Sequence, residues 1–96
     1  MLVLVAYDVS TLDGDGVRRL RKVAKACVNY GIRVQKSVFE CNVQPYQWEE
    51  LKSELLDLYN PDEDSLRFYY LGSNWKRRVD HFGLSSNYEH DEPMII

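Results

Sequence analysis

The sequence of 96 residues has no long apolar run. Its most apolar segment, residues 2–9, is much shorter than the roughly 20 residues that a membrane-spanning helix needs. This segment also lacks the basic flank and the small-residue cleavage site of a secretory signal. We therefore expect a cytoplasmic protein without a membrane partner.

Cysteine and histidine are scarce, with two of each. Cys27 and Cys41 do not have the spacing of metal ligands, and neither His81 nor His90 has a second ligand pair nearby, which argues against a zinc site. We expect two buried free thiols and two surface histidines. A disulfide is the minor alternative, because a reducing compartment opposes it.

Three common functional motifs are missing. The stretch LDGDG lacks the lysine and the spacing of a nucleotide-binding loop. No serine has the flanking glycines of a hydrolase nucleophile elbow. The stretch RVQKSVFEC contains a single aromatic residue, whereas an RNA-recognition signature interleaves several. The sequence therefore gives no support to these three classes of site.

Charge is unevenly distributed, although the formal net charge is only -3 and the isoelectric point is near 5.3. Residues 17–36 contain many cations and no Asp or Glu, while acids gather in residues 49–64 and 89–92. A segment of one sign favours a phosphate-binding surface over the alternative, a solvated helix face, because ordinary faces mix both signs. The cations are Arg18, Arg19, Arg21, Lys22, Lys25, Arg33 and Lys36.

Apolar periodicity predicts the first two elements. Residues 2–9 are rich in Val and Leu and precede the turn-forming STLDGDG, which predicts a buried central strand. From Gly16 apolar residues recur at spacings of three and four, which predicts a helix that ends near Gly31. Its predicted buried stripe comprises Val17, Leu20, Val23, Ala24, Cys27 and Val28.

The remaining elements follow from the same reasoning. Residues 32–43 alternate with a change of phase, which predicts two short strands joined by a tight turn or bulge near Lys36 and Ser37. Pro45 begins a second amphipathic helix, and residues 65–72 alternate as another strand. The apolar stripe of the second helix comprises Trp48, Leu51, Leu55 and Leu58.

This order of elements predicts an α+β fold, the ferredoxin-like β-α-β-β-α-β arrangement with both helices on one face of an antiparallel sheet. We expect residues 1–72 to form this core and residues 73–96 to form a C-terminal extension that contributes to a dimer. The other face of the sheet needs cover, which a second copy of the chain supplies most simply. Terminal fraying is the alternative for the extension.

Asp8 is a carboxylate at the end of the first strand. It has two interpretations: a cap for the following turn, or a ligand for a divalent cation, since hard cations prefer carboxylate oxygen. One carboxylate is a poor metal site. If two copies meet near this strand end, their two Asp8 side chains form a shared site for Mg²⁺ beside a phosphate.

Four stretches together resemble one known family, CRISPR-associated protein 2: VAYDVS, the basic first helix, YGIRVQKSVFEC and DSLRFYYLG. The stretches ECNV and LGSNW are similar to variants of type I-C systems. The resemblance implies a ferredoxin-like homodimer whose C-terminal strand is exchanged between chains. It also implies a role in spacer acquisition beside the integrase, CRISPR-associated protein 1.

The resemblance implies an endonuclease that depends on Mg²⁺ (or Mn²⁺) and hydrolyses double-stranded DNA or single-stranded RNA. The alternative is a non-catalytic dimeric adaptor that bridges integrase subunits and binds spacer-precursor DNA. Asp8 matches the metal-binding and catalytic aspartate, and Tyr7 and Phe39 match aromatic positions beside it. The implied nucleic-acid-binding residues are Arg18, Arg19 and Arg33, joined in the adaptor hypothesis by Lys22 and Lys25.

Overall fold

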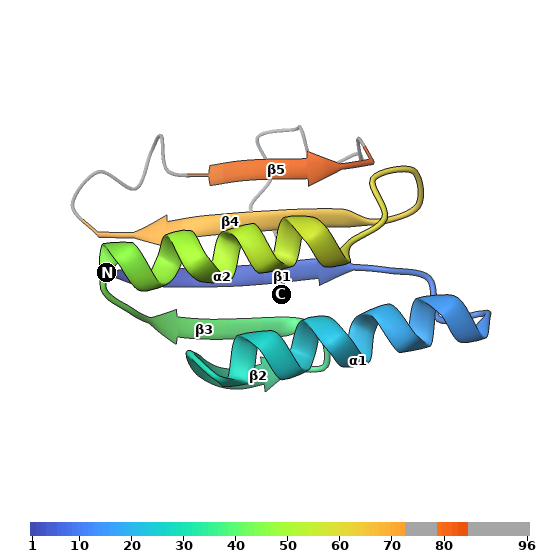
Figure 1. Ribbon diagram of the computed structural model, residues 1–96, viewed down its shortest axis with the longest axis horizontal. Helices are drawn as coiled ribbons and strands as arrows, with labels where there is room; N and C mark the ends of the chain where they lie inside the picture. Colours follow the sequence, from blue (N-terminus) through green and yellow to red (C-terminus); the bar gives the residue numbers. More distant parts are fainter. Residues whose placement is uncertain (73–78, 85–96) are drawn as a thin grey trace.

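One antiparallel sheet carries both helices on the same face in the computed structural model, which describes residues 1–72 and 79–84 (Figure 1). Its five strands lie in the order β2-β3-β1-β4-β5. The predicted ferredoxin-like α+β fold is confirmed. The elements along the chain are β1 Leu2–Asp8, α1 Gly14–Val28, β2 Gly31–Gln35, β3 Val38–Asn42, α2 Pro45–Leu58, β4 Ser65–Leu71 and β5 Val79–Gly83.

Strand β1 is central, as predicted, because it pairs with both β3 and β4. Its burial alternates along the strand. Val3, Val5 and Tyr7 are at most 1% exposed beneath the helices, whereas Leu4 and Ala6 are half-buried on the opposite face. The predicted burial of this strand is therefore confirmed on the helix side and is only partial on the second face, which no helix of the described residues covers.

Helix α1 begins at Gly14, within the Asp- and Gly-rich residues 13–16 that predict its start, and the side chain of Asp13 caps it by accepting a hydrogen bond from the Gly16 amide at 2.9 Å. Gly16 lies so close to the preceding loop that an added Cβ would meet the Ser10 carbonyl oxygen at 1.7 Å. The predicted stripe was wrong at both ends of the helix, where Val17 and Val28 are exposed. Its middle residues are buried against the sheet.

Cys27 of α1 and Cys41 of β3 are free and fully buried, as expected. The Cys41 thiol lies 3.8 Å from the Cys27 carbonyl oxygen. The neighbouring Cys41 thiol, together with burial, raises the pKa of the Cys27 thiol, so this thiol remains protonated.

The hairpin of β2 and β3 confirms the predicted change of phase. Its register shifts between Arg33 and Gln35, and the chain turns at residues 36–37. This turn lies at the same end of the sheet as the end of β1, because the Tyr7 amide donates to the Ser37 carbonyl oxygen at 2.9 Å. The hairpin therefore borders the end of the strand that carries Asp8.

Helix α2 begins at Pro45, as predicted. The Gln47 side chain accepts a hydrogen bond from the Gln44 amide at 2.8 Å and so caps the first turn. Trp48, with Leu51 and Leu55, is buried against the sheet, where its ring meets Phe68 edge-on with centroids 4.8 Å apart. The helix stripe is thus core, as its spacing predicted.

No residue pattern predicted strand β5, although the family resemblance implies a C-terminal strand without giving its residues. It pairs antiparallel with β4 of its own chain, from Ser65 opposite Gly83 to Tyr69 opposite Val79. The exchange of a C-terminal strand between two chains stays a prediction. The expected roles of residues 73–78 and 85–96 lie outside the described residues.

The face of the sheet away from α1 and α2, on which no helix of the described residues lies, is called the helix-free face. Residues paired across neighbouring strands share a face, so it carries Leu4, Glu40 and Tyr69 near its middle and Asp8 at one end. Cover of this face by a second copy of the chain stays a prediction.

Over residues 1–72 and 79–84, no helix is long and apolar enough to cross a membrane.

Candidate functional site

Asp8 ends β1 on the helix-free face, and its side chain is exposed. It lies directly opposite Ser65, the first residue of β4. Among the described residues, no hydrogen bond or ion pair engages its carboxylate. The cap of the following helix is Asp13 instead. The turn-capping alternative for Asp8 therefore finds no support in the structure, and its carboxylate is available to a ligand.

A divalent cation needs more donors than Asp8 alone. Within residues 1–72 and 79–84, no group of three or more His, Cys, Asp or Glu side chains could hold a metal ion. Cations such as Mg²⁺ and Ca²⁺ take several oxygen ligands. The described residues of one chain therefore do not fit a complete metal site, and a site shared between two chains is the form that Asp8 permits.

A buried carboxylate, Asp64, joins three parts of the chain. It is 0% exposed. The Tyr7 hydroxyl donates a hydrogen bond to it, and the Arg19 guanidinium donates two, from Nε to Oδ2 at 2.9 Å and from a terminal nitrogen to Oδ1 at 3.1 Å. The Asn60 amide donates to Oδ2 at 2.8 Å. The network therefore ties β1, α1 and the loop before β4 together at one end of the sheet.

Tyr7 was expected beside the site, but its ring lies on the helix side of β1, opposite the face of Asp8. Burial, followed by the hydrogen bond to Asp64 and the charge of that carboxylate, raises the pKa of Tyr7 well above its usual range. The phenol therefore remains a neutral hydrogen-bond donor. Its contribution to Asp8 is to anchor the end of β1.

Arg19 was expected to bind nucleic acid, but in the structure its charge is already paired. It contacts Glu63 at 3.2 Å in addition to the buried Asp64, and its side chain is only 17% exposed. The hydrogen bond to Asp64 raises the pKa of Arg19. We assign Arg19 to the connection between α1 and the β4 loop, and its binding to phosphate stays a prediction.

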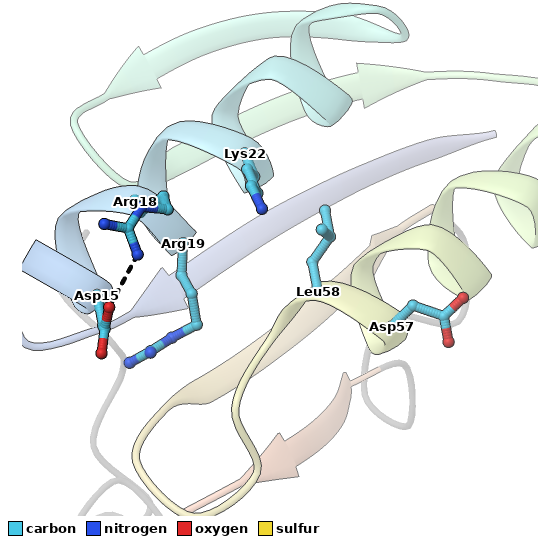
Figure 2. Close-up of a pocket in the computed structure, with 6 residues that line it drawn as sticks. All are labelled: Asp15, Arg18, Arg19, Lys22, Asp57 and Leu58. Carbon is cyan, nitrogen blue, oxygen red and sulfur yellow. Dashed lines mark hydrogen bonds and ion pairs between the residues drawn. The ribbon is translucent and has the colours of Figure 1, made fainter.

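The other cations of α1 face solvent. Arg18 pairs with Asp15 at 2.9 Å, and both side chains are more than half exposed. Lys22 and Lys25 are exposed. Part of this surface borders a groove of about 300 Å³ between α1 and the end of α2, shown in Figure 2. Its lining combines both signs of charge: Asp15, Arg18, Arg19, Lys22, Asp57 and Leu58.

Arg33 and Phe39 lie opposite each other in the β2–β3 hairpin. The guanidinium carbon lies 5.5 Å from the centre of the Phe39 ring, and Arg33 Nε donates to the Lys36 carbonyl oxygen at 2.7 Å. Phe39 is fully buried. Both residues share the helix-side face, so a single chain does not bring them onto the face of Asp8.

His81, which the sequence predicts to be an ordinary surface histidine, lies near Asp8 in the structure. His81 of β5 has its Nε2 atom 2.9 Å from Ser65 Oγ, and Ser65 is opposite Asp8. The sequence carried no signal for this arrangement, because no residue pattern predicted β5. The site at the end of β1 is therefore built by three neighbouring strands.

The comparisons with known proteins agree with this fold. The sequence model of the family described as CRISPR associated protein Cas2 matches residues 1–79. The chain belongs to this family. A protein of Nitratidesulfovibrio vulgaris named CRISPR-associated endoribonuclease Cas2 is 54% identical over 96 residues, which is 100% of this chain and 94% of that protein. The predicted family resemblance is confirmed.

Other Cas2 proteins support the same assignment. One from Halalkalibacterium halodurans, named CRISPR-associated endonuclease Cas2, is 53% identical over the whole of both chains, at 100% of each. The crystal structure of Streptococcus pyogenes Cas2 at pH 6.5 is 53% identical, covers 86% of this chain and 100% of that one, and superposes with a TM-score of 0.73. The type I-C subtype stays a prediction.

Proposed function

We propose that this Cas2 family member is an endonuclease that hydrolyses phosphodiester bonds in double-stranded DNA or single-stranded RNA. The observation that carries the proposal is the exposed carboxylate of Asp8 at the end of the central strand, which has no partner among the residues that the structure describes. Relatives of high identity named as an endoribonuclease and as an endonuclease support it. A cleavage assay with both substrates decides between RNA and DNA.

The proposed active form is a homodimer in which Asp8 of each chain contributes to one shared divalent-cation site. The half-buried apolar residues of the helix-free face, such as Leu4 and Ala6, favour cover by a second copy. Mg²⁺ or Mn²⁺ bound between the two carboxylates would neutralise charge on the phosphodiester. The chain itself contributes the carboxylates and the rigid strand end that holds them.

The proposal is tested by incubating the wild-type protein with linear double-stranded DNA and with single-stranded RNA, in Mg²⁺, in Mn²⁺ and in a chelator. We expect cleavage of at least one substrate with metal and none with chelator, because two carboxylates alone do not activate a phosphodiester. Equal cleavage with and without chelator would contradict the metal site. If a protein that is shown to be dimeric cleaves neither substrate, the proposed nuclease function is refuted.

A second candidate function is a non-catalytic adaptor that works in the cytoplasm beside the CRISPR-associated protein 1 integrase during spacer acquisition. The observation in its favour is the exposed basic face of α1, on which Lys22 and Lys25 have no described ion-pair partner. In this role the dimer binds spacer-precursor DNA through phosphates, without reading its bases. The basic face then matters more than Asp8.

Removing charge from α1 separates the two roles. We expect the combined variant Arg18→Gln, Lys22→Gln, Lys25→Gln to bind double-stranded DNA more weakly and with a flatter salt dependence, by about 0.9 in the log–log slope for each phosphate that the variant no longer neutralises. Arg19 is left intact because it holds Asp64. Fluorescence anisotropy in chelator at several salt concentrations measures both quantities.

The matched control is Lys52→Gln, which removes a cation from α2, where Lys52 lies 3.9 Å from Asp80. This variant is expected to keep the wild-type slope. If the α1 variant binds with wild-type affinity and slope, the basic face has no part in DNA binding.

A further inference from the structure

Three polar side chains from three neighbouring strands meet at one end of the helix-free face. Asp8 ends β1, Ser65 begins β4, and His81 lies on β5. Asp8 and Ser65 are direct partners across antiparallel strands, a position in which Cβ atoms lie about 5 Å apart. Ser65 Oγ is in turn 2.9 Å from His81 Nε2. Ser65 therefore lies between the carboxylate and the imidazole.

The sheet register explains how His81 reaches Ser65. The residue directly opposite Ser65 on β5 is Gly83, and His81 lies two residues before it on the same strand, so its imidazole reaches Ser65 along the diagonal between the two strands. Gly83 is required there, because its φ is +100° and an added Cβ would meet the Asp64 carbonyl oxygen at 2.1 Å. The close approach of Gly83 to the Asp64 backbone thus fixes the end of β5 beside the start of β4.

The surroundings of His81 leave its imidazole half-buried at the sheet edge. Arg67 lies directly opposite it on β4, and Asp8 is the nearest carboxylate along the register on the same face. Asp80 is on the other face, where it accepts a hydrogen bond from the Tyr70 hydroxyl at 2.7 Å. A phosphate at Asp8 would thus have an imidazole and a guanidinium on the neighbouring strands.

We propose that Ser65 and His81 form a proton relay at this site, in which the Ser65 hydroxyl contacts the attacking water and His81 accepts the proton through that hydroxyl. The inference rests on the proposed nuclease function and supplies a base that Asp8, as a ligand, does not provide. Ser65 donates its proton to His81 Nε2 in the tautomer that carries its proton on Nδ1. The Ser65 oxygen simultaneously takes a proton from the attacking water.

The step balances in atoms and charge. The water oxygen forms a bond to phosphorus as the bond between phosphorus and the leaving ester oxygen breaks, and the leaving oxygen takes a proton from solvent. The imidazolium formed at His81 then releases its proton to solvent. One water is consumed, and the products are a phosphomonoester end and a hydroxyl end. Ser65 regains its proton and is not altered.

The test measures cleavage and binding by His81→Ala in the dimeric protein, on the substrate that the wild type cuts. We expect kcat to fall by about a hundredfold or more, the usual contribution of a general base, with KM and DNA affinity in chelator unchanged. Added imidazole is expected to restore part of the activity of His81→Ala. Ser65→Ala is expected to lose activity to a similar extent, without rescue by imidazole.

The matched control is Asp80→Asn, which changes the neighbouring residue of β5 on the opposite face and is expected to retain wild-type kcat. If His81→Ala does not fold as a dimer, His81→Asn replaces it with the same expectations. Wild-type activity in the His81 variant, or a loss that imidazole does not restore, would overturn the assignment. If the wild-type protein cuts neither substrate, the proposed nuclease function is refuted. If the wild type cuts and the His81 variant cuts equally well, only the role of His81 is refuted.

Discussion

Cleavage by the Asp8→Asn variant is expected to fall by more than about a hundredfold, since loss of a metal ligand costs more than the loss of an outer-sphere partner. The variant keeps the shape of the side chain and removes its charge. Asp8 is exposed and has no described partner, so the free energy of unfolding should change by at most about 0.5 kcal/mol. A large loss of activity without a loss of stability identifies a functional carboxylate.

The measurement compares initial cleavage rates over a range of Mg²⁺ concentrations, with thermal unfolding and size-exclusion chromatography on the same samples. The matched control is Glu40→Gln, because Glu40 lies on the same helix-free face opposite Leu4 but away from the end of β1. This control is expected to cut at the wild-type rate. Undiminished cleavage by Asp8→Asn would refute the assignment of Asp8.

Asp64→Ala is expected to lower the free energy of unfolding by about 3 kcal/mol or more, because it removes one partner of a buried charge pair. The Arg19 guanidinium loses two hydrogen bonds, and the Tyr7 hydroxyl and the Asn60 amide lose their acceptor. Asp64 is fully buried, so water does not replace these partners without opening the core. Tyr7→Phe removes a single hydrogen bond and should cost about 1 kcal/mol.

Urea unfolding followed by circular dichroism measures the effect, at one fixed protein concentration because the stability of a dimer depends on concentration. The matched control is Asp62→Ala, which changes an exposed residue of the same loop and should shift the free energy of unfolding by at most about 0.5 kcal/mol. If Asp64→Ala and Asp62→Ala unfold at the same urea concentration, the network does not stabilise the fold.

The sequence by itself determined the order and type of the first six elements, because their signals are local. The stripe of Trp48, Leu51 and Leu55 has the helical period, and the change of phase in residues 32–43 required a turn that lies at residues 36–37. The position of Asp8 directly after an apolar run was equally visible. Such features depend on neighbours within a few residues, which is the range over which periodicity is informative.

The tertiary structure decided which side chains meet. Tyr7 and Asp64 are 57 residues apart in the chain, Arg19 and Asp64 are 45 apart, and Ser65 and His81 are 16 apart. Strand β5 has no clear alternation of its own, since its residues are exposed or half-buried, and it exists through pairing with β4. Charge and the family resemblance both indicated Arg19 as a ligand for phosphate, whereas a buried carboxylate from a distant loop holds it, because a charge removed from water requires a partner.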